Sequence, residues 1–107
     1  MYRKTYVKVD NDILESNVKE IIKKYNSYKY YIGVVKANAY GHGSYIINNL
    51  INAGINYLAV SSLEEALDVR KYNKEFPVLV LCPVALEFVD IIYKEKDNYL
   101  NKMLFIK

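Results

Sequence analysis

Lys36 is the residue of this sequence whose position best suits covalent chemistry. It ends the apolar run at residues 30–36 and precedes a loop at residues 37–43. A lysine at the end of a buried strand carries its amine to the mouth of a site, where partial desolvation leaves more free amine to attack an aldehyde. This is how a lysine forms a Schiff base with pyridoxal 5′-phosphate. Lysines at strand ends are also commonly just solvated, so the position alone leaves both interpretations open.

The loop after Lys36 contains residue types that suit a bound aromatic ring. Gly41 and Gly43 allow sharp backbone turns beside a ligand. Tyr40 offers a flat face and a hydroxyl. The spacing of the two glycines matches neither the dinucleotide-binding fingerprint nor the Walker A loop, so neither kind of phosphate cradle is expected.

The elements that must position Lys36 are predicted from the apolar pattern. Strands are predicted where short runs of apolar, β-branched or aromatic residues occur, at residues 5–9, 30–36, 57–60, 78–81 and 103–107. The run at 30–36 is nearly continuous, and we therefore expect it to be buried on both faces.

Four helices are predicted from apolar residues at helical spacing. The first follows the N-cap candidates Asp10 and Asn11, and its apolar stripe is Leu14, Val18, Ile21, Ile22 and Tyr25. The second, which ends near Gly54, has the stripe Ile46, Ile47, Leu50 and Ile51. The third opens with a capping-box spacing at residues 62–65 and is expected to bury Leu63, Ala66, Leu67 and Val69. The fourth starts at Pro83 and carries Val84, Leu86, Val89, Ile92 and Tyr93.

This alternation predicts an α/β fold built from parallel βαβ units. Either a doubly wound open sheet or part of a (β/α)8 barrel would satisfy it. A complete barrel takes ~250 residues, so a chain of 107 residues would supply about half of one. In both folds ligands bind at the carboxyl ends of the strands, which is where Lys36 lies.

Composition excludes several other classes of protein. A length of 107 residues fits one domain, and one cysteine excludes a disulfide framework or a multi-cysteine zinc site. The net charge of +3 comes from scattered lysines, which is unlike a nucleic-acid-binding face. No apolar run is long enough to span a bilayer and no secretory signal is visible, so a cytoplasmic protein is expected.

The sequence Val-Val-Lys-Ala-Asn-Ala-Tyr-Gly-His-Gly at residues 34–43 resembles the pyridoxal-phosphate lysine signature of bacterial alanine racemases. The similarity continues in register along almost the whole chain. Arg3, Thr5, Val9 and Asp10 resemble the opening strand of that family. Residues 60–67 resemble its second barrel strand and the helix that follows, and residues 77–81 resemble its third strand.

The resemblance implies a pyridoxal-phosphate-dependent enzyme that interconverts L- and D-alanine for peptidoglycan precursor supply. It implies that residues 1–107 form the N-terminal portion, about the first half, of an alanine-racemase-type (β/α)8 TIM barrel, without the C-terminal β domain. The partners it implies are the amino-acid substrate and a second copy in a homodimer, with no nucleic acid, membrane or metal. A serine or other amino-acid racemase, or a pyridoxal-phosphate-binding module without turnover, remains an alternative. Single-domain pyridoxal-phosphate homeostasis proteins lack the Ala-Asn-Ala-Tyr-Gly-His-Gly continuation.

By position in the motif, Lys36 matches the lysine that binds the cofactor and acts as one of two catalytic bases. Tyr40, Val34 and Leu81 match positions that line the cofactor pocket. The opposing tyrosine, the arginine facing the pyridine nitrogen and the main phosphate-binding loops belong to later segments of the family. The 107-residue chain alone is therefore expected to be inactive.

The other notable residues are expected to be structural. His42 is expected to anchor its turn, and Cys82 to act as a small hydrophobic residue after a buried strand. Glu64 and Glu65 suit a helix N-terminus and are assigned no catalysis. A half barrel also leaves open edges at residues 30–36 and 103–107 and an uncovered inner face at Val34, Ala59, Leu79 or their neighbours, which favours self-association or a partly molten state.

Overall fold

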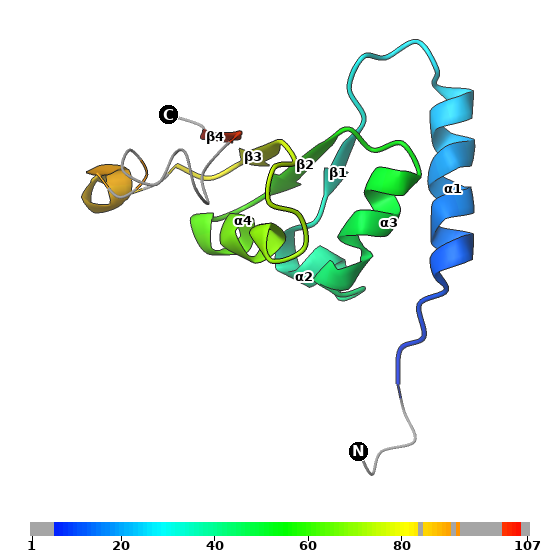
Figure 1. Cartoon of the computed structure of the whole chain (residues 1–107), viewed down its shortest axis with the longest axis horizontal. Coiled ribbons are helices and arrows are strands. Elements are labelled where there is room, and N and C mark those ends of the chain that lie inside the picture. The colour runs from blue at the N-terminus through cyan, green and yellow to red at the C-terminus, as the bar shows by residue number, and fades with distance from the viewer. Residues whose placement is uncertain (1–5, 84, 91, 93–101, 106–107) are drawn as a thin grey trace.

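Four parallel strands form one sheet in chain order (Figure 1). The computed structural model describes residues 6–83, 85–90, 92 and 102–105. The strands are β1 (Ile32–Val34), β2 (Tyr57–Val60), β3 (Val78–Val80) and β4 (Met103–Phe105). The helices are α1 (Asn11–Lys24), α2 (Lys36–Tyr40), α3 (Ile47–Asn52) and α4 (Leu63–Arg70), with 3-10 turns η1 (Ser44–Ile46) and η2 (Leu86–Phe88). The predicted α/β class with parallel βαβ units is confirmed.

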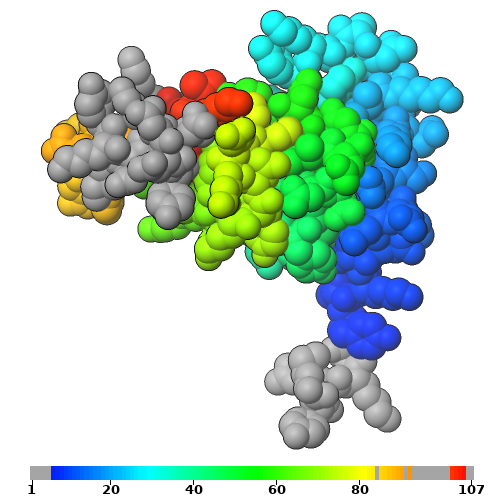
Figure 2. All heavy atoms as spheres, viewed as in Figure 1, coloured from blue at the N-terminus to red at the C-terminus, as the bar shows by residue number. Residues whose placement is uncertain are grey.

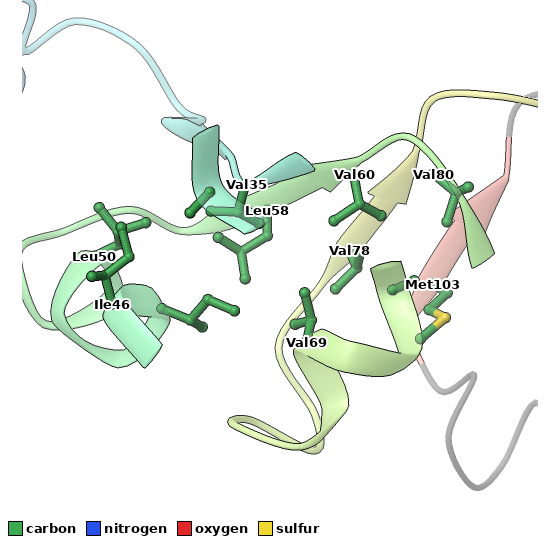
Figure 3. Close-up of a cluster of buried hydrophobic side chains, with 12 residues drawn as sticks. Val35, Ile46, Leu50, Leu58, Val60, Val69, Val78, Val80 and Met103 are labelled. Atoms are coloured by element: carbon green, nitrogen blue, oxygen red, sulfur yellow. The ribbon is translucent and has the colours of Figure 1, made fainter. Parts of the chain in front are cut away.

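Helices α2, α3 and α4 lie on one face of the sheet (Figure 1). The strand residues facing them are buried, and Leu58, Val60, Val78 and Val80 are fully so. Figure 3 shows Val60 and Val78 near Val69 of α4 and Leu58 beside Val35, and Leu50 and Ile46 belong to the same cluster. Burying a side chain of this size contributes ~1.5–3 kcal/mol, so this layer supplies most of the apolar stabilisation. Helix α1 packs against α3 rather than on the sheet (Figure 1).

Helix ends follow the predicted caps. The Asp10 carboxylate accepts hydrogen bonds from the backbone N–H groups of Asp12 and Ile13, which fixes the start of α1. Helix α3 ends at its C-cap Ala53, and the next residue, Gly54, has a φ of +116°. The Gly54 conformation is one that glycine adopts at little cost.

The predicted strand at residues 5–9 is wrong over residues 6–9, and Thr5 lies outside the described residues. These residues form no strand, and Tyr6 and Val7 are 73% and 79% exposed. The start of the segment extends away from the body of the molecule (Figure 2), whereas Val9 packs against the core. A β-prone sequence becomes a strand only where another strand offers a ladder of hydrogen bonds, and this segment pairs with none of the described strands.

The expectation that residues 30–36 are buried on both faces is also wrong. Only Ile32–Val34 form a strand, and Ile32 and Val34 are 47% and 41% exposed. Both point away from the helices, because neighbouring residues in a strand face opposite sides. β1 is therefore an edge strand covered on one face alone.

Two helices differ from their predictions. In α4, Leu67 is exposed and Arg70 is buried instead, because Ala66, Val69 and Arg70 share the inner face. The Arg70 guanidinium donates a hydrogen bond to the Phe76 carbonyl, which allows its burial.

The predicted helix at Pro83 starts later, as the 3-10 turn at Leu86, because Ala85 has an extended backbone. Leu86 and Val89 are exposed, whereas Ile92 packs against the core as expected. Val84 and Tyr93 lie outside the described residues.

The edges of the sheet are β1 and β4, as expected for an open sheet. On the face away from the helices, Val34 is exposed and Leu79 is partly buried. Ala59, expected to be exposed, is buried at 2% exposure, because its small side chain lies between β1 and β3. Leu104 on β4 is 58% exposed on the same face. We call this face, formed by Ile32, Val34, Leu79 and Leu104, the open sheet face.

We expect the 107-residue chain to associate through the open sheet face, since it presents apolar side chains beside unpaired strand edges. Leu104→Lys should weaken association at least ~10-fold, the equivalent of one lost leucine contact. Ile13→Lys on α1 is the matched control, because Ile13 is 59% exposed and Leu104 is 58% exposed. This variant should not change the association. Sedimentation velocity over a dilution series measures both. A strictly monomeric wild-type chain with a sharp unfolding transition would contradict the expectation.

Candidate functional site

Lys36 lies at the carboxyl end of β1, where the sheet meets the loop that leads to α3. The backbone N–H of Val35 still bonds to the Ala59 carbonyl at 2.9 Å, so the ladder with β2 continues up to the residue before Lys36. Lys36 itself is half-buried. Its Nζ lies 6.0 Å from the centre of the Tyr40 ring, within reach of a cation–π contact. Lys36 and Tyr40, the two residues of the motif with side chains suited to chemistry, therefore lie next to each other.

The segment labelled α2 is not a right-handed helix: after Lys36 its backbone follows a left-handed turn. Ala37, Asn38, Ala39 and Tyr40 have φ values between 52° and 55°, and Gly41 follows at 88°. A left-handed helix costs ~1–2 kcal/mol per non-glycine residue, so this turn needs hydrogen bonds at both of its ends to persist. The sequence predicts sharp turns at Gly41 and Gly43, whereas the left-handed turn already starts at Ala37.

Hydrogen bonds from within the loop hold the far end of this turn. The Asn38 Oδ1 accepts from the backbone N–H of Ser44 at 3.0 Å and from its hydroxyl at 3.1 Å. The Nδ1 of His42 lies 3.0 Å from the Ala39 carbonyl oxygen. His42 therefore has the contact of a turn anchor, as predicted. Gly43 has a φ of +95°, and a Cβ there would lie 2.3 Å from the Tyr45 ring, so this position requires glycine.

The near end of the turn is held by Glu65 of α4. Its Oε2 accepts a hydrogen bond from the backbone N–H of Ala37 at 2.7 Å. Its Oε1 accepts from the backbone N–H of Ser61 at 2.8 Å and also from the Ser61 hydroxyl. One carboxylate therefore connects the loop after β1 to the end of β2.

Burial raises the pKa of Glu65, but hydrogen bonds from Ser61, Ala37 and Ser62 outweigh it, so the net effect is a pKa below the ordinary value. Glu65 is ionised at neutral pH and accepts as a carboxylate.

Sequence analysis missed this role of Glu65. The capping-box spacing predicted correctly that the Ser62 hydroxyl accepts from the Glu65 backbone N–H, at 3.2 Å. The Glu65 carboxylate, however, extends beyond its own helix to the neighbouring loop. Nothing local in the sequence shows which loop lies beside the first turn of α4, since that depends on the sheet order.

The remaining predicted site residues, Val34 and Leu81, come from different strands. Val34 is on the open sheet face at the end of β1. Leu81 directly follows β3, and its backbone N–H bonds to the Val60 carbonyl at 2.8 Å. Leu81 is two residues beyond Leu79, so strand alternation places both on the open sheet face. All four predicted residues therefore lie at the carboxyl edge of the sheet, with Val34 and Leu81 separated by β2.

Two pockets open near this edge. One, of about 220 Å³, lies under the loop and is lined by Val35, Asn38, Ser44, Glu65, Asp68 and Val69. The other, of about 180 Å³, lies past the ends of β2 and β3 and includes Cys82 and Phe88. Cys82, predicted to be a small hydrophobic residue after a buried strand, follows β3 as expected and is itself exposed. Neither pocket is lined by Lys36 or Tyr40.

The described part of the chain lacks a cluster of metal-ligating side chains and a membrane-spanning helix. Within residues 6–83, 85–90, 92 and 102–105, no three His, Cys, Asp or Glu side chains gather as metal ligands would. Over those same residues, no helix has the length and apolar character needed to cross a bilayer.

Comparison with known proteins gives a consistent result. The family model described as "Alanine racemase, N-terminal domain" matches residues 9–99. The alanine racemase of Halalkalibacterium halodurans is 39% identical over 97 residues, which cover 89% of this chain and 25% of that protein. Alanine racemase 1 of Bacillus subtilis is 38% identical over 91 residues, which cover 84% of this chain and 23% of that protein.

Solved structures agree with the fold. The crystal structure of alanine racemase from Bacillus anthracis with bound L-Ala-P matches 100% of this chain and 26% of that chain, with a TM-score of 0.83 and 32% identity. Alanine racemase from Oenococcus oeni matches 85% of this chain with a TM-score of 0.68 and 26% identity. The four parallel strands correspond to the first part of the alanine racemase barrel. The chain spans about a quarter of the length of these relatives.

Proposed function

This chain belongs to the alanine racemase family, in the part that the N-terminal domain model covers, and on that premise we propose that it binds pyridoxal 5′-phosphate through Lys36. The observation that carries the proposal is the placement of Lys36. Lys36 follows the carboxyl end of a parallel strand, and its amine lies beside the Tyr40 ring. Among the described residues, no carboxylate forms an ion pair with the Lys36 amine.

The residues around Lys36 fit the aldehyde and ring of this cofactor. The Lys36 amine is the nucleophile that an aldehyde requires. Tyr40 is 59% exposed, and its ring offers a flat surface. A Cβ placed on Gly41 would have no heavy atom within 4 Å, so the space beside this glycine is open. Val34 and Leu81 add apolar surface at the same edge of the sheet. We propose that Lys36 holds the cofactor covalently and that Tyr40, Val34 and Leu81 line its pocket.

The proposed reaction is the interconversion of L- and D-alanine, carried out as part of the family's complete barrel and homodimer. When bound, pyridoxal 5′-phosphate provides an electron sink that stabilises negative charge on the α-carbon of an amino acid. The role of Lys36 is to move a proton at that carbon, as one of two bases on opposite faces. Alanine is the proposed substrate because the relatives described above are alanine racemases, and D-alanine for peptidoglycan precursors is the proposed product.

Titration with pyridoxal 5′-phosphate tests the proposal. The wild-type chain should give a saturable change in visible absorbance, which Lys36→Ala abolishes because it removes the amine. Lys29→Ala is the matched control, since Lys29 Nζ also lies over a tyrosine ring, 5.3 Å from the centre of Tyr30. It should bind as the wild type does. A saturable change of equal size in Lys36→Ala would contradict the proposal.

A further inference from the structure

We propose that Glu65 is a positioning residue, which aims Lys36 by holding the backbone N–H of Ala37. This inference rests on the proposed role of Lys36 in binding the cofactor. It concerns a carboxylate that lies on α4, far along the chain from Lys36.

The peptide between Lys36 and Ala37 is the point at which the backbone enters its left-handed turn. Val35 before it has a φ of −118°, whereas Ala37 has a φ of +52°. Other backbone N–H groups of the turn donate to nearby carbonyls of the same segment. The Ala39 N–H donates to the Val35 carbonyl, and the Gly41 N–H donates to the Ala37 carbonyl. The Ala37 N–H is instead bonded to Glu65 at 2.7 Å. This bond fixes the peptide directly after the Lys36 Cα, from which the reactive side chain leaves.

Glu65 is itself held firmly enough to serve as a fixed point. The Ser61 N–H and hydroxyl both donate to Oε1, while Oε2 remains for Ala37. Ser61 follows directly after β2, so the carboxylate joins the ends of two neighbouring strands. A hydrogen bond to an ionised acceptor is about twice as strong as one between neutral groups, which suits a contact that must hold a strained turn.

The adjacent residue Glu64 provides a matched control. It has the same side chain on the same first turn of α4, but it is exposed and lies at a different pocket, beside Cys82 and Pro83. Any effect of charge near the N-terminus of α4 should appear in variants of either residue. An effect of holding Ala37 should appear only in variants of Glu65.

The experiment measures trapping of the cofactor at Lys36. The 107-residue chain is incubated with pyridoxal 5′-phosphate, reduced with borohydride and digested, and the yield of pyridoxyl-Lys36 is compared with that at the other lysines. Glu65→Ala should lower the yield at Lys36 at least ~10-fold, the size expected from losing one hydrogen bond to a charged acceptor. Labelling of the other lysines should not change. Glu64→Ala should match the wild type. Glu65→Gln has one acceptor oxygen where the carboxylate uses two, so it can accept from Ala37 or from Ser61 but not from both, and its yield should lie between those of the wild type and Glu65→Ala.

Hydrogen exchange separates positioning from loss of fold. In Glu65→Ala, exchange should accelerate at the Ala37 amide while Leu58 and Val60 of β2 stay protected. If β2 loses protection as well, Ser61→Ala, which removes only the hydroxyl that orients Glu65, is measured instead. That variant should lower the Lys36 yield by about threefold, the lower end for a single hydrogen bond.

An unchanged Lys36 yield in a folded Glu65→Ala variant, or in Ser61→Ala where Glu65→Ala does not fold, overturns the positioning role alone. A wild-type chain whose Lys36 is labelled no more than its other lysines overturns the proposed function, and the positioning role with it.

Discussion

The 107-residue chain on its own is expected to racemise alanine at least ~10²–10⁴-fold more slowly than a full-length relative, the range for losing one acid–base group. Racemisation requires a proton to leave one face of the α-carbon and return on the other. Within these residues the family resemblance assigns one of the two bases, Lys36. The chain matches about a quarter of the length of its relatives.

The comparison that measures this loss is an alanine racemisation assay on the purified chain and on alanine racemase 1 of Bacillus subtilis at equal concentrations. Lys36→Ala serves as the control for contaminating activity. Turnover within about tenfold of the full-length enzyme that disappears in Lys36→Ala would contradict the expectation. It would mean that a second base lies within residues 1–107.

The parts of the fold that local pattern determines could be predicted from the sequence. β2 occupies the predicted residues 57–60, and β3 is one residue shorter than the predicted run at 78–81. Asp10 and Ser62 cap their helices as their positions before an apolar stripe suggest. Each of these features depends on neighbours a few residues away, and the motif at Lys36 is likewise a continuous segment.

The parts that depend on distant elements could not be predicted in this way. Residues 6–9 have the composition of a strand, but a strand forms only beside a partner. Burial of Arg70 depends on the Phe76 carbonyl, two residues before β3. The left-handed turn after Lys36 depends on Glu65, which reaches it only because β1 and β2 are adjacent. The residue that supports the candidate site was therefore hidden from an analysis of local patterns.

Reaction of pyridoxal 5′-phosphate is expected to depend entirely on Lys36. The half-buried Lys36 differs from the exposed lysines in leaving the carboxyl end of a parallel strand, in contact with Tyr40. The cofactor should therefore collect at one position of the 13 lysines that the sequence contains. Lys29→Ala, which changes a lysine with a similar tyrosine contact, should leave the pattern as it is.

Peptide mapping by mass spectrometry after borohydride reduction, at a cofactor concentration equal to that of the protein, tests the central claim most directly. The account predicts a pyridoxyl group on the peptide that contains Lys36, and its disappearance in Lys36→Ala without transfer to another single lysine. Labelling spread evenly over the lysines of the wild-type chain, or a labelling pattern that Lys36→Ala leaves unchanged, would contradict it.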